Sequence, residues 1–214
     1  MTAREAILGQ VRMHLRRVPC QAPPAIPEAR IRVPVMDRAA RIEMLMQRMI
    51  ALSGTAVHVA TLAEACNTVA QITGGASAVA SNAPLLREAG ITALPGVRTG
   101  FTVEAELRAL CATAPFGISS ADYALCDTGT LVMMASPADA RLISLLPPVH
   151  IAVVPADRVL SGLDELFTLD ALPADHTSST VFITGPSRTA DIEQLLVRGV
   201  HGPGEIHLIV VGEG

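Results

Sequence analysis

Lysine is absent from this chain, and aromatic residues are few. All 16 basic residues are arginine, and the 214 residues include no tryptophan, one tyrosine and four phenylalanines. Without lysine there is no Schiff-base lysine, no pyridoxal phosphate anchor and no P-loop lysine. Single-stranded nucleic acid would find few aromatic rings to stack on, and the net charge of -4 disfavours a phosphate backbone. Several enzyme classes are thereby excluded, and we expect no nucleic acid partner.

Cysteine is also scarce, and the N-terminus lacks the pattern of a signal peptide. The spacing of the four cysteines argues against a zinc site or an iron–sulfur cluster held by this chain alone, so we expect no bound metal or cofactor. No apolar run approaches the ~20 residues of a transmembrane helix. The expected protein is cytoplasmic, without a membrane span. Its cysteines, expected to be reduced and buried, are Cys20, Cys66, Cys111 and Cys126.

Half of the residues are apolar, which is enough to bury one sizeable core. The N-terminal part differs from the rest, because residues 4–17 have helical apolar spacing with a basic face and residues 18–34 contain five prolines. We therefore expect an N-terminal helix and proline-rich linker over 1–34, and a single α/β domain over 35–214. The first helix packs on the domain, exchanges with a neighbouring subunit of a homo-oligomer, or is offered to a partner.

The domain alternates helix-like and strand-like segments. Residues 37–52 form an amphipathic pattern, and Thr61 with Glu64 forms a capping box that begins the next helix. Such alternation predicts a mainly parallel sheet covered on both faces. The other elements expected in this part are strands over 56–60 and 76–80, helical turns over 84–89 and a helix over 102–112.

The periodicity changes near residue 118. Residues 118–126 and 130–135 are both strand-like, and the turn Asp127-Thr128-Gly129 between them predicts an antiparallel hairpin. At the tip of the hairpin, Gly129 either relieves steric strain or admits a ligand close to the backbone. His58 and His150 lie in apolar strand-like runs and are expected in the core or at a sheet edge. The remaining elements expected are a buried strand over 145–154, a helix over 159–167 and a last strand over 206–211.

Residues 180–203 contain the most prominent candidate site. A β-branched run ends at Gly185, and the helical spacing of residues 192, 195 and 196 predicts a strand, a loop and a helix. Ser187, Arg188 and Thr189 would then stand at a helix N-terminus, where backbone N–H groups and a guanidinium attract anions. The alternative is that a hydroxyl only caps the helix and that Arg188 pairs with Asp191 or Glu193.

Five segments of the chain resemble the LUD-domain family. The resemblance covers about the C-terminal half, and the family usually has Glu where this chain has Asp127. It implies a Rossmann-like three-layer α/β sandwich of the sugar-phosphate isomerase and CoA-transferase type. It also implies a role in bacterial use of L-lactate, as the cluster-free partner of iron–sulfur subunits that oxidise lactate to pyruvate. The segments are 117–124, 127–132, 144–154, 185–193 and 199–203.

The titratable and polar residues of these segments define the candidate site, if their loops meet at the carboxyl edge of the sheet. Asp127 and His201 are the candidate catalytic residues, as base or nucleophile and as general acid or base. His201 as an ordinary loop histidine is the alternative. The candidate ligands of a small carboxylate or phosphate are Thr128, Gly129, Thr130, Gly185, Ser187, Arg188, Thr189, Asp191 and Glu193.

Three functions stay open from the sequence. The first is an accessory subunit of a lactate-oxidising complex, which the family resemblance favours. The second is a small-molecule isomerase or acyl/CoA transferase that uses Asp127. The third is a regulatory module that binds a small carboxylate or a phosphorylated metabolite.

Overall fold

The computed structural model describes residues 2–15, 22, 25, 36–170, 173–192 and 195–214, with the backbone alone for residues 174, 189–192 and 195–198. The chain divides into two units, Met1–Ile31 and Arg32–Gly214. The first unit contains helix α1 (Ala3–Leu15), in which no residue is buried. The spacing of its apolar residues predicts this helix, whereas most of the proline-rich linker lies outside the described residues.

The second unit is built on a six-stranded sheet with the order β1-β12-β7-β4-β2-β3. All of its described pairings are parallel. After β2 the next strand, β3, is added at one edge of the sheet. After β4 the next strand of this sheet, β7, is added on the opposite side. The connections therefore reverse direction between β2 and β4. The strands are β1 (Thr55–Val59), β2 (Ala78–Ala80), β3 (Val97–Arg98), β4 (Phe116–Ser120), β7 (Val149–Pro155) and β12 (Glu205–Val211).

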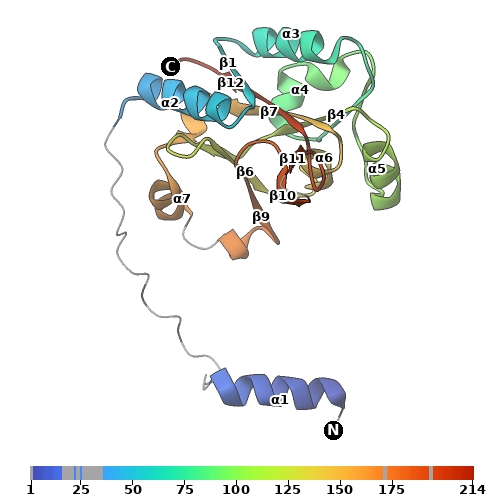
Figure 1. Cartoon of the computed structure of the whole chain (residues 1–214), viewed down its shortest axis with the longest axis vertical. Helices are drawn as coiled ribbons and strands as arrows, with labels where there is room; N and C mark the ends of the chain where they lie inside the picture. The colour runs from blue at the N-terminus through green and yellow to red at the C-terminus, as the bar shows by residue number, and fades with distance from the viewer. Residues whose placement is uncertain (1, 16–21, 23–24, 26–35, 171–172, 193–194) are drawn as a thin grey trace. The chain divides into compact units, whose positions relative to one another are not determined.

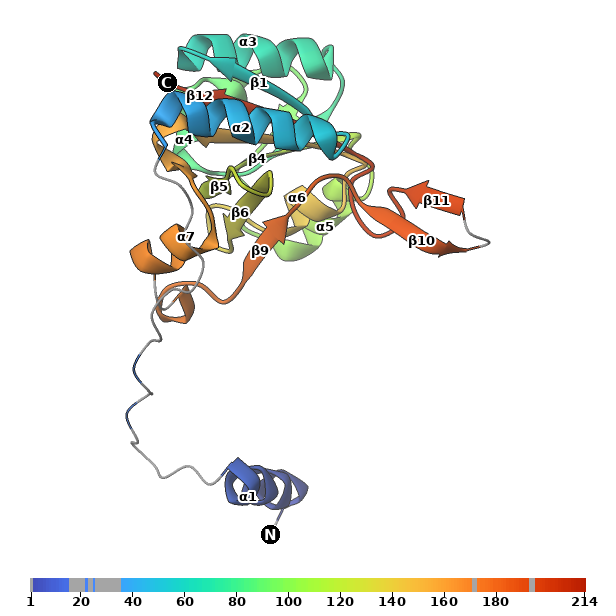
Figure 2. The same ribbon diagram turned by 60° about the vertical axis from the view of Figure 1, so that its left-hand side comes forward.

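Helices cover both faces of this sheet (Figure 1). On one face α3 and α4 bury Val69 and Leu86 against Ile118 and Ile151. The other face is covered by α2, which lies across β12 (Figure 2), and by α5 and α6. The predicted capping box forms at the start of α3. These helices are α2 (Arg38–Ala51), α3 (Leu62–Thr73), α4 (Pro84–Glu88), α5 (Glu104–Cys111) and α6 (Leu142–Leu145).

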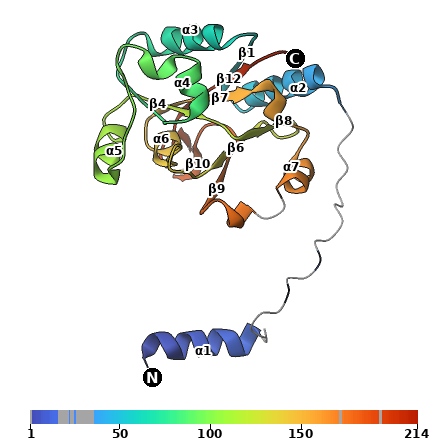
Figure 3. The same cartoon turned by 180° about the vertical axis from the view of Figure 1, so that it is seen from behind.

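A second sheet of four strands, in the order β8-β5-β6-β9, forms part of the layer that contains α2 (Figure 3). One of its faces packs into the main core through Cys126, Leu131 and Met133. The other face packs on Leu166 of helix α7. The predicted hairpin is present as the antiparallel pair β5 and β6. The elements are β5 (Tyr123–Leu125), β6 (Thr130–Met134), β8 (Val159–Leu160), β9 (Thr180–Ile183) and α7 (Leu163–Leu169), with the short 3₁₀ helices η1 (Ile91–Ala93), η2 (Ala156–Arg158) and η3 (Pro173–Asp175).

The α/β fold with a mostly parallel sheet is confirmed, but two local predictions are wrong. The single strand predicted over 118–126 is two strands, β4 and β5, because the chain turns at Ala121-Asp122 from one sheet into the other. The helix predicted over 159–167 begins only at Leu163, since Val159 and Leu160 pair with β5.

The helix predicted after Gly185 is also wrong. The chain forms a β-hairpin there, β10 (Arg188–Ile192) with β11 (Leu195–Arg198), which projects away from the two sheets (Figure 2). The reason is that the backbone N–H of Gly199 donates to the carbonyl of Ser187 at 3.0 Å. A helix over 189–198 would separate its ends by about 15 Å, whereas a hairpin brings them together.

The two strand histidines lie where the sequence predicts. His150 is fully buried in β7, where Ser119 Oγ lies 2.7 Å from its Nε2. Burial lowers the pKa of His150 to about 4, so the ring is neutral at neutral pH. His58 lies in the edge strand β1, and its Nε2 lies 2.8 Å from the carbonyl oxygen of Gly212.

Candidate functional site

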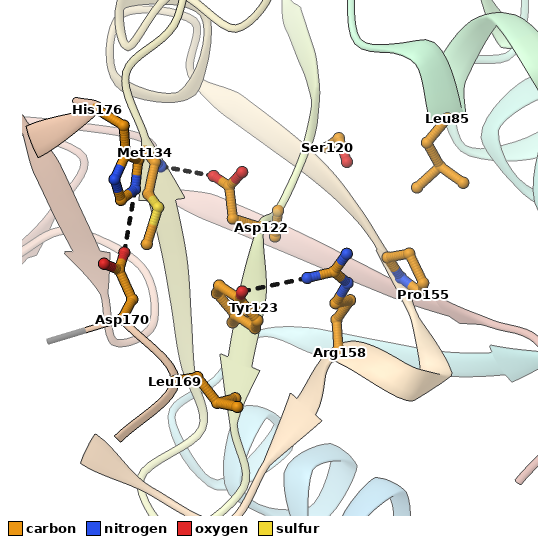
Figure 4. A pocket seen from close by; sticks show the side chains of 11 residues that line it. Leu85, Ser120, Asp122, Tyr123, Met134, Pro155, Arg158, Leu169, Asp170 and His176 are labelled. Carbon is orange, nitrogen blue, oxygen red and sulfur yellow. Dashed lines mark hydrogen bonds and ion pairs between the residues drawn. The ribbon is translucent and has the colours of Figure 1, made fainter. Parts of the chain in front are cut away.

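A cavity of about 450 Å³ opens at the carboxyl ends of the central strands. Leu85, just after β2, Ser120 at the end of β4 and Pro155 at the end of β7 form one side of it (Figure 4). Tyr123 and Met134 of the four-stranded sheet form part of the other side. The cavity therefore lies beside the point where the strand connections reverse direction, the usual ligand position in open α/β sheets. We call it the carboxyl-end cavity.

The carboxyl-end cavity is lined by two aspartates, an arginine and a histidine. Asp122 accepts a hydrogen bond at 2.6 Å from the backbone N–H of Met134 at the end of β6. His176 Nε2 lies 3.1 Å from Asp170 Oδ2. The guanidinium of Arg158 donates to the hydroxyl of Tyr123 at 3.1 Å and lies 5.3 Å from the centre of that ring.

Arg158 is exposed and keeps donors for a ligand. Its contact with Tyr123 is the one hydrogen bond of this guanidinium within the described part of the chain. A guanidinium has five N–H donors in a planar fork, which matches a carboxylate bidentately. The remaining donors of Arg158 are thus suited to a small carboxylate in the carboxyl-end cavity.

Asp139 lies in the loop after β6 and is not one of the residues that line the carboxyl-end cavity. Burial, followed by the charge of Asp122, raises the pKa of Asp139 to about 7, against the opposing influence of Ser81 and the Ser120 backbone. Burial also raises the pKa of Asp122, against the hydrogen bond from Met134 and the charges of Arg158 and His176.

The residues that the sequence predicts as a site gather elsewhere, around the C-terminal end of α2. Thr130 donates to the hydroxyl of Thr128 at 2.8 Å, and Thr128 donates to the carboxylate of Asp127 at 3.1 Å. The Thr184 hydroxyl lies 2.8 Å from that of Thr130, and it must be the donor because Thr130 already donates to Thr128. These three hydroxyl protons form one relay that ends at Asp127.

The glycines of this cluster are explained by the packing of α2. Gly129 has a φ of +69°, and a Cβ built there would lie 2.8 Å from Arg48 Cβ. Gly185 has a φ of +82°, and its Cβ would lie 2.9 Å from Leu52 Cβ. Both positions combine a left-handed backbone with a close neighbour, so only glycine fits without strain.

The sequence predicts that Arg188 stands at the N-terminus of a helix. In the structure it instead binds the C-terminal end of α2. Its Nη2 donates to the carbonyl oxygen of Leu52 and, at 3.2 Å, to the hydroxyl of Ser53. Ser53 has a φ of 69° and ends the helix in a left-handed turn closed by the N–H of Gly54 on the Met49 carbonyl at 3.0 Å. A cation at this helix end is favourable, because the helix dipole is negative there.

The loop of residues 199–204, also predicted to belong to the site, lies beside Ser187. The backbone N–H of Ser187 donates to the carbonyl of Pro203 at 2.8 Å, and that of Gly204 donates to the carbonyl of Pro148 at 2.9 Å. His201 is an exposed residue of this loop. Thr189 and Asp191 are described by their backbone in β10, and Glu193 lies outside the described residues.

These loops lie at the amino ends of the parallel strands, because β7 begins at Val149 and β12 at Glu205. The expected position at the carboxyl edge is therefore wrong. We call the cluster of residues 127–130, 184–188 and 199–204 the amino-end cluster. Ligand binding and catalysis by its members stay predictions.

The sequence interpretation did not identify Asp122, Asp139, Arg158 and His176 as site residues. A signal was present for Asp122, which lies inside the family-like segment 117–124. The rule that ligands bind at the carboxyl ends of strands also points to residues just after β4 and β7. Asp139 and His176 come from loops whose positions in space no local pattern fixes.

Metal-ligating side chains do not cluster in the described part of the chain. Within it, no three His, Cys, Asp or Glu side chains are placed to hold a metal ion. Cys66, Cys111 and Cys126 are free thiols, and burial raises the pKa of each. No helix there has the length and apolar character needed to cross a membrane.

Comparison with known proteins gives partial sequence matches to several curated relatives. A protein named lactate utilization protein C from Exiguobacterium sp. is 40% identical over 108 residues, which cover 49% of this chain and 47% of the relative. A protein of the same name from Halalkalibacterium halodurans is 39% identical over 102 residues, which cover 46% of this chain and 44% of the relative. The matched part thus spans less than half the length of either relative.

A solved structure shares the fold. The crystal structure of a DUF162 family protein from Deinococcus radiodurans is 22% identical in sequence, with a TM-score of 0.65. The similarity covers 83% of this chain and all of that chain. The LUD domain model matches residues 42–211, from α2 to the last residue of β12. This chain therefore belongs to the LUD domain family.

Proposed function

We propose that this chain is a subunit of a bacterial lactate-utilization system and binds a small carboxylate in the carboxyl-end cavity. The observation that carries the proposal is the guanidinium of Arg158, which lines the cavity and keeps donors for a ligand. The names of the curated relatives supply the metabolic context. A 2-hydroxycarboxylate such as L-lactate has a carboxylate for Arg158 and a hydroxyl that Asp122 can accept from.

Its place in that system is the cluster-free accessory subunit beside iron–sulfur partners that oxidise L-lactate to pyruvate. The wide spacing of the four cysteines supports this role, because it leaves the cluster ligands to other chains. Purification of the tagged protein from its own cells should recover proteins that contain iron and labile sulfide. Recovery of the chain alone, under conditions that preserve such clusters, would contradict the accessory role.

Ligand binding is tested by calorimetry with L-lactate. Arg158→Gln should weaken binding by about ten- to a hundredfold, because a charge-assisted hydrogen bond contributes about 1.5–3 kcal/mol. Stability should change little, since Arg158 is exposed. The matched control is Arg108→Gln at an exposed position of α5, which should bind like the unmodified protein. Equal affinity of the Arg158 and Arg108 variants would exclude this cavity as the binding site.

The second candidate function is an isomerase that moves a carbon-bound proton of the bound carboxylate ligand. The observation that favours it is Asp122, which lines the cavity together with Arg158 and can act as a general base toward a ligand held there. Such an enzyme should exchange a carbon-bound proton of L-lactate or pyruvate with D₂O. Nuclear magnetic resonance of the two compounds detects this exchange. Exchange that persists unchanged in Asp122→Asn would argue against the isomerase.

A further inference from the structure

The carboxyl-end cavity is larger than L-lactate requires. Its volume of about 450 Å³ lies within the range of about 300–1,000 Å³ that is usual for ligands of drug size. L-Lactate, with one carboxylate and one hydroxyl, is far smaller than such a ligand, so it would leave most of this space to water. The polar groups that line the remaining space therefore indicate what a ligand that fills the cavity would carry.

Tyr123 supplies a second donor beside Arg158. The phenolic oxygen of Tyr123 accepts the hydrogen bond from Arg158 at 3.1 Å, so its own O–H remains to donate. Within the described part of the chain this O–H has no acceptor, and both side chains line the cavity (Figure 4). A guanidinium and a phenol that stand side by side suit the two oxygens of one carboxylate.

The acceptors of the cavity are two separate carboxylates. Asp122 accepts from the backbone N–H of Met134 at 2.6 Å, and Asp170 Oδ2 lies 3.1 Å from His176 Nε2. Each carboxylate has about four lone-pair sites, so both keep capacity for a ligand. Asp170 and His176 stand on one side of the cavity and Ser120 on the other, with Asp122 between them (Figure 4). The single hydroxyl of L-lactate can donate to only one of the two aspartates.

Other kinds of larger ligand fit this lining less well. An apolar chain would remove water from Asp122 and Asp170 without replacing its hydrogen bonds, which is unfavourable for a charged group. A second anionic group on the ligand would be repelled by the same two carboxylates at short range. Hydroxyl groups instead donate to carboxylates, so they are the ligand groups that match both aspartates.

We propose that the carboxyl-end cavity takes a polyhydroxylated carboxylate, a chain of hydroxyl-bearing carbons with one carboxylate at its end. Arg158 and Tyr123 hold the carboxylate, and Asp122 accepts from a hydroxyl close to it. Asp170, oriented by His176, accepts from a hydroxyl farther along the chain. This inference rests on the proposed function, because it names the chemical class of the carboxylate that the same cavity binds. L-Lactate is then a small member of this class.

The test is calorimetry at pH 7 with L-lactate, D-gluconate and hexanoate. D-Gluconate has a hydroxyl on every carbon beyond its carboxylate, and hexanoate has the same number of carbons without any hydroxyl. D-Gluconate should bind at least about tenfold more tightly than L-lactate, because it makes additional hydrogen bonds to charged acceptors. Hexanoate should bind more weakly than L-lactate. This ligand series uses the unmodified protein and decides independently of any variant.

Asp170→Ala separates a hydroxyl contact from an effect of charge. The variant should bind D-gluconate about tenfold more weakly and should not lose affinity for L-lactate. Loss of a negative charge alone would favour any anion, so a weakened affinity for D-gluconate reports a lost hydrogen bond. Asp175→Ala is the matched control, because Asp175 is exposed, precedes His176 and does not line the cavity.

Tyr123→Phe tests the other end of the ligand. The variant should bind L-lactate and D-gluconate more weakly by the same factor, because both carboxylates lose the phenolic donor. Equal affinity of Tyr123→Phe and the unmodified protein for both ligands would contradict the place given to the carboxylate. A thermal melt shows that each variant is folded.

The outcomes distinguish the two proposals. L-Lactate that binds as tightly as D-gluconate, or D-gluconate that binds equally to Asp170→Ala and Asp175→Ala, would overturn the inference and leave the proposed function standing. Hexanoate that binds as tightly as D-gluconate would also overturn it. If neither L-lactate nor D-gluconate binds, both proposals fail. Binding of D-gluconate without L-lactate would support the polyhydroxylated class and contradict L-lactate as the ligand.

Discussion

The two ends of the main sheet use similar residue types in different ways. At the amino-end cluster the threonine hydroxyls donate to one another and to Asp127, and Arg188 donates to the end of α2. At the carboxyl-end cavity Arg158 makes a single described hydrogen bond and faces open space. An arginine, an aspartate and neighbouring hydroxyls therefore do not define a binding site by themselves. What matters is whether their hydrogen-bonding groups are already used within the chain.

The largest expected effect on stability concerns the amino-end cluster. Gly129→Ala should lower the free energy of unfolding by about 2–4 kcal/mol, through the left-handed backbone and the contact of the new Cβ with Arg48. Gly74→Ala is the matched control, because its φ is +55° and nothing lies within 4 Å of the new Cβ. That control should lose only about 1 kcal/mol. Urea unfolding measures both, and equal losses would mean that α2 does not constrain Gly129.

The pH dependence of stability should depend on two titratable groups, Asp139 and His150. The pKa of Asp139 is raised from 3.8 to about 7, so its contribution is fully present below pH 3.8 and is lost as the pH rises to 7. His150 acts in the opposite direction, because its pKa is lowered from 6.5 to about 4 and its contribution is lost as the pH falls through that range. The two slopes, each at most about 1.4 kcal/mol per pH unit, oppose each other between pH 4 and 6.5.

In Asp139→Asn the change of the free energy of unfolding with pH should therefore come from His150 without the opposing effect of Asp139. In this variant the free energy of unfolding should rise with pH from 4 to 6.5, where the unmodified protein shows a flatter profile. The variant should also be more stable than the unmodified protein at pH 8, since it no longer buries a charged carboxylate. Urea unfolding at several pH values is the measurement. Parallel profiles for the two proteins would show that Asp139 has an ordinary pKa.

A smaller effect is expected from Arg188→Gln. The loss of its bonds to Leu52 and Ser53 should lower the free energy of unfolding by about 1 kcal/mol, because these bonds are exposed. The affinity for L-lactate should not change. Urea unfolding and calorimetry test the two statements separately. Unchanged stability together with a lost affinity would make Arg188 a ligand residue, as the sequence alone predicts.

The smallest expected effect is a gain in stability. Ser53→Gly should raise the free energy of unfolding by about 0.5–1 kcal/mol, because glycine adopts the left-handed conformation at the end of α2 without strain. The hydrogen bond from Arg188 to the serine hydroxyl would be lost, and this loss is the reason for the lower end of the expected range. A destabilised Ser53→Gly variant would show that this bond outweighs the backbone strain.

Much of the fold follows from local patterns in the sequence. The capping box of Thr61 and Glu64, the amphipathic stripe of α2 and the turn at Asp127 each act over a few residues, and each appears as predicted. The hairpin of β10 and β11 does not follow, because the spacing of Ile192, Leu195 and Leu196 fits a helix as well as two short strands. The bond between Gly199 and Ser187 decides the outcome, and it joins residues twelve positions apart.

The candidate site was harder to predict than the fold. Its position depends on strand direction, and residues such as Ser120 and Pro155 become neighbours of a cavity only through the order of the strands. Asp139 acquires its raised pKa from burial and from Asp122, neither of which the sequence specifies. The arginine most prominent in the sequence, Arg188, lies instead at the amino end.

The most direct test of this account compares the two arginines in one binding measurement. The Kd for L-lactate is measured by calorimetry at pH 6.5 for the unmodified protein, Arg158→Gln and Arg188→Gln. Binding should weaken by about ten- to a hundredfold in Arg158→Gln alone. A loss in Arg188→Gln with full affinity in Arg158→Gln would place the ligand at the amino-end cluster and contradict the account.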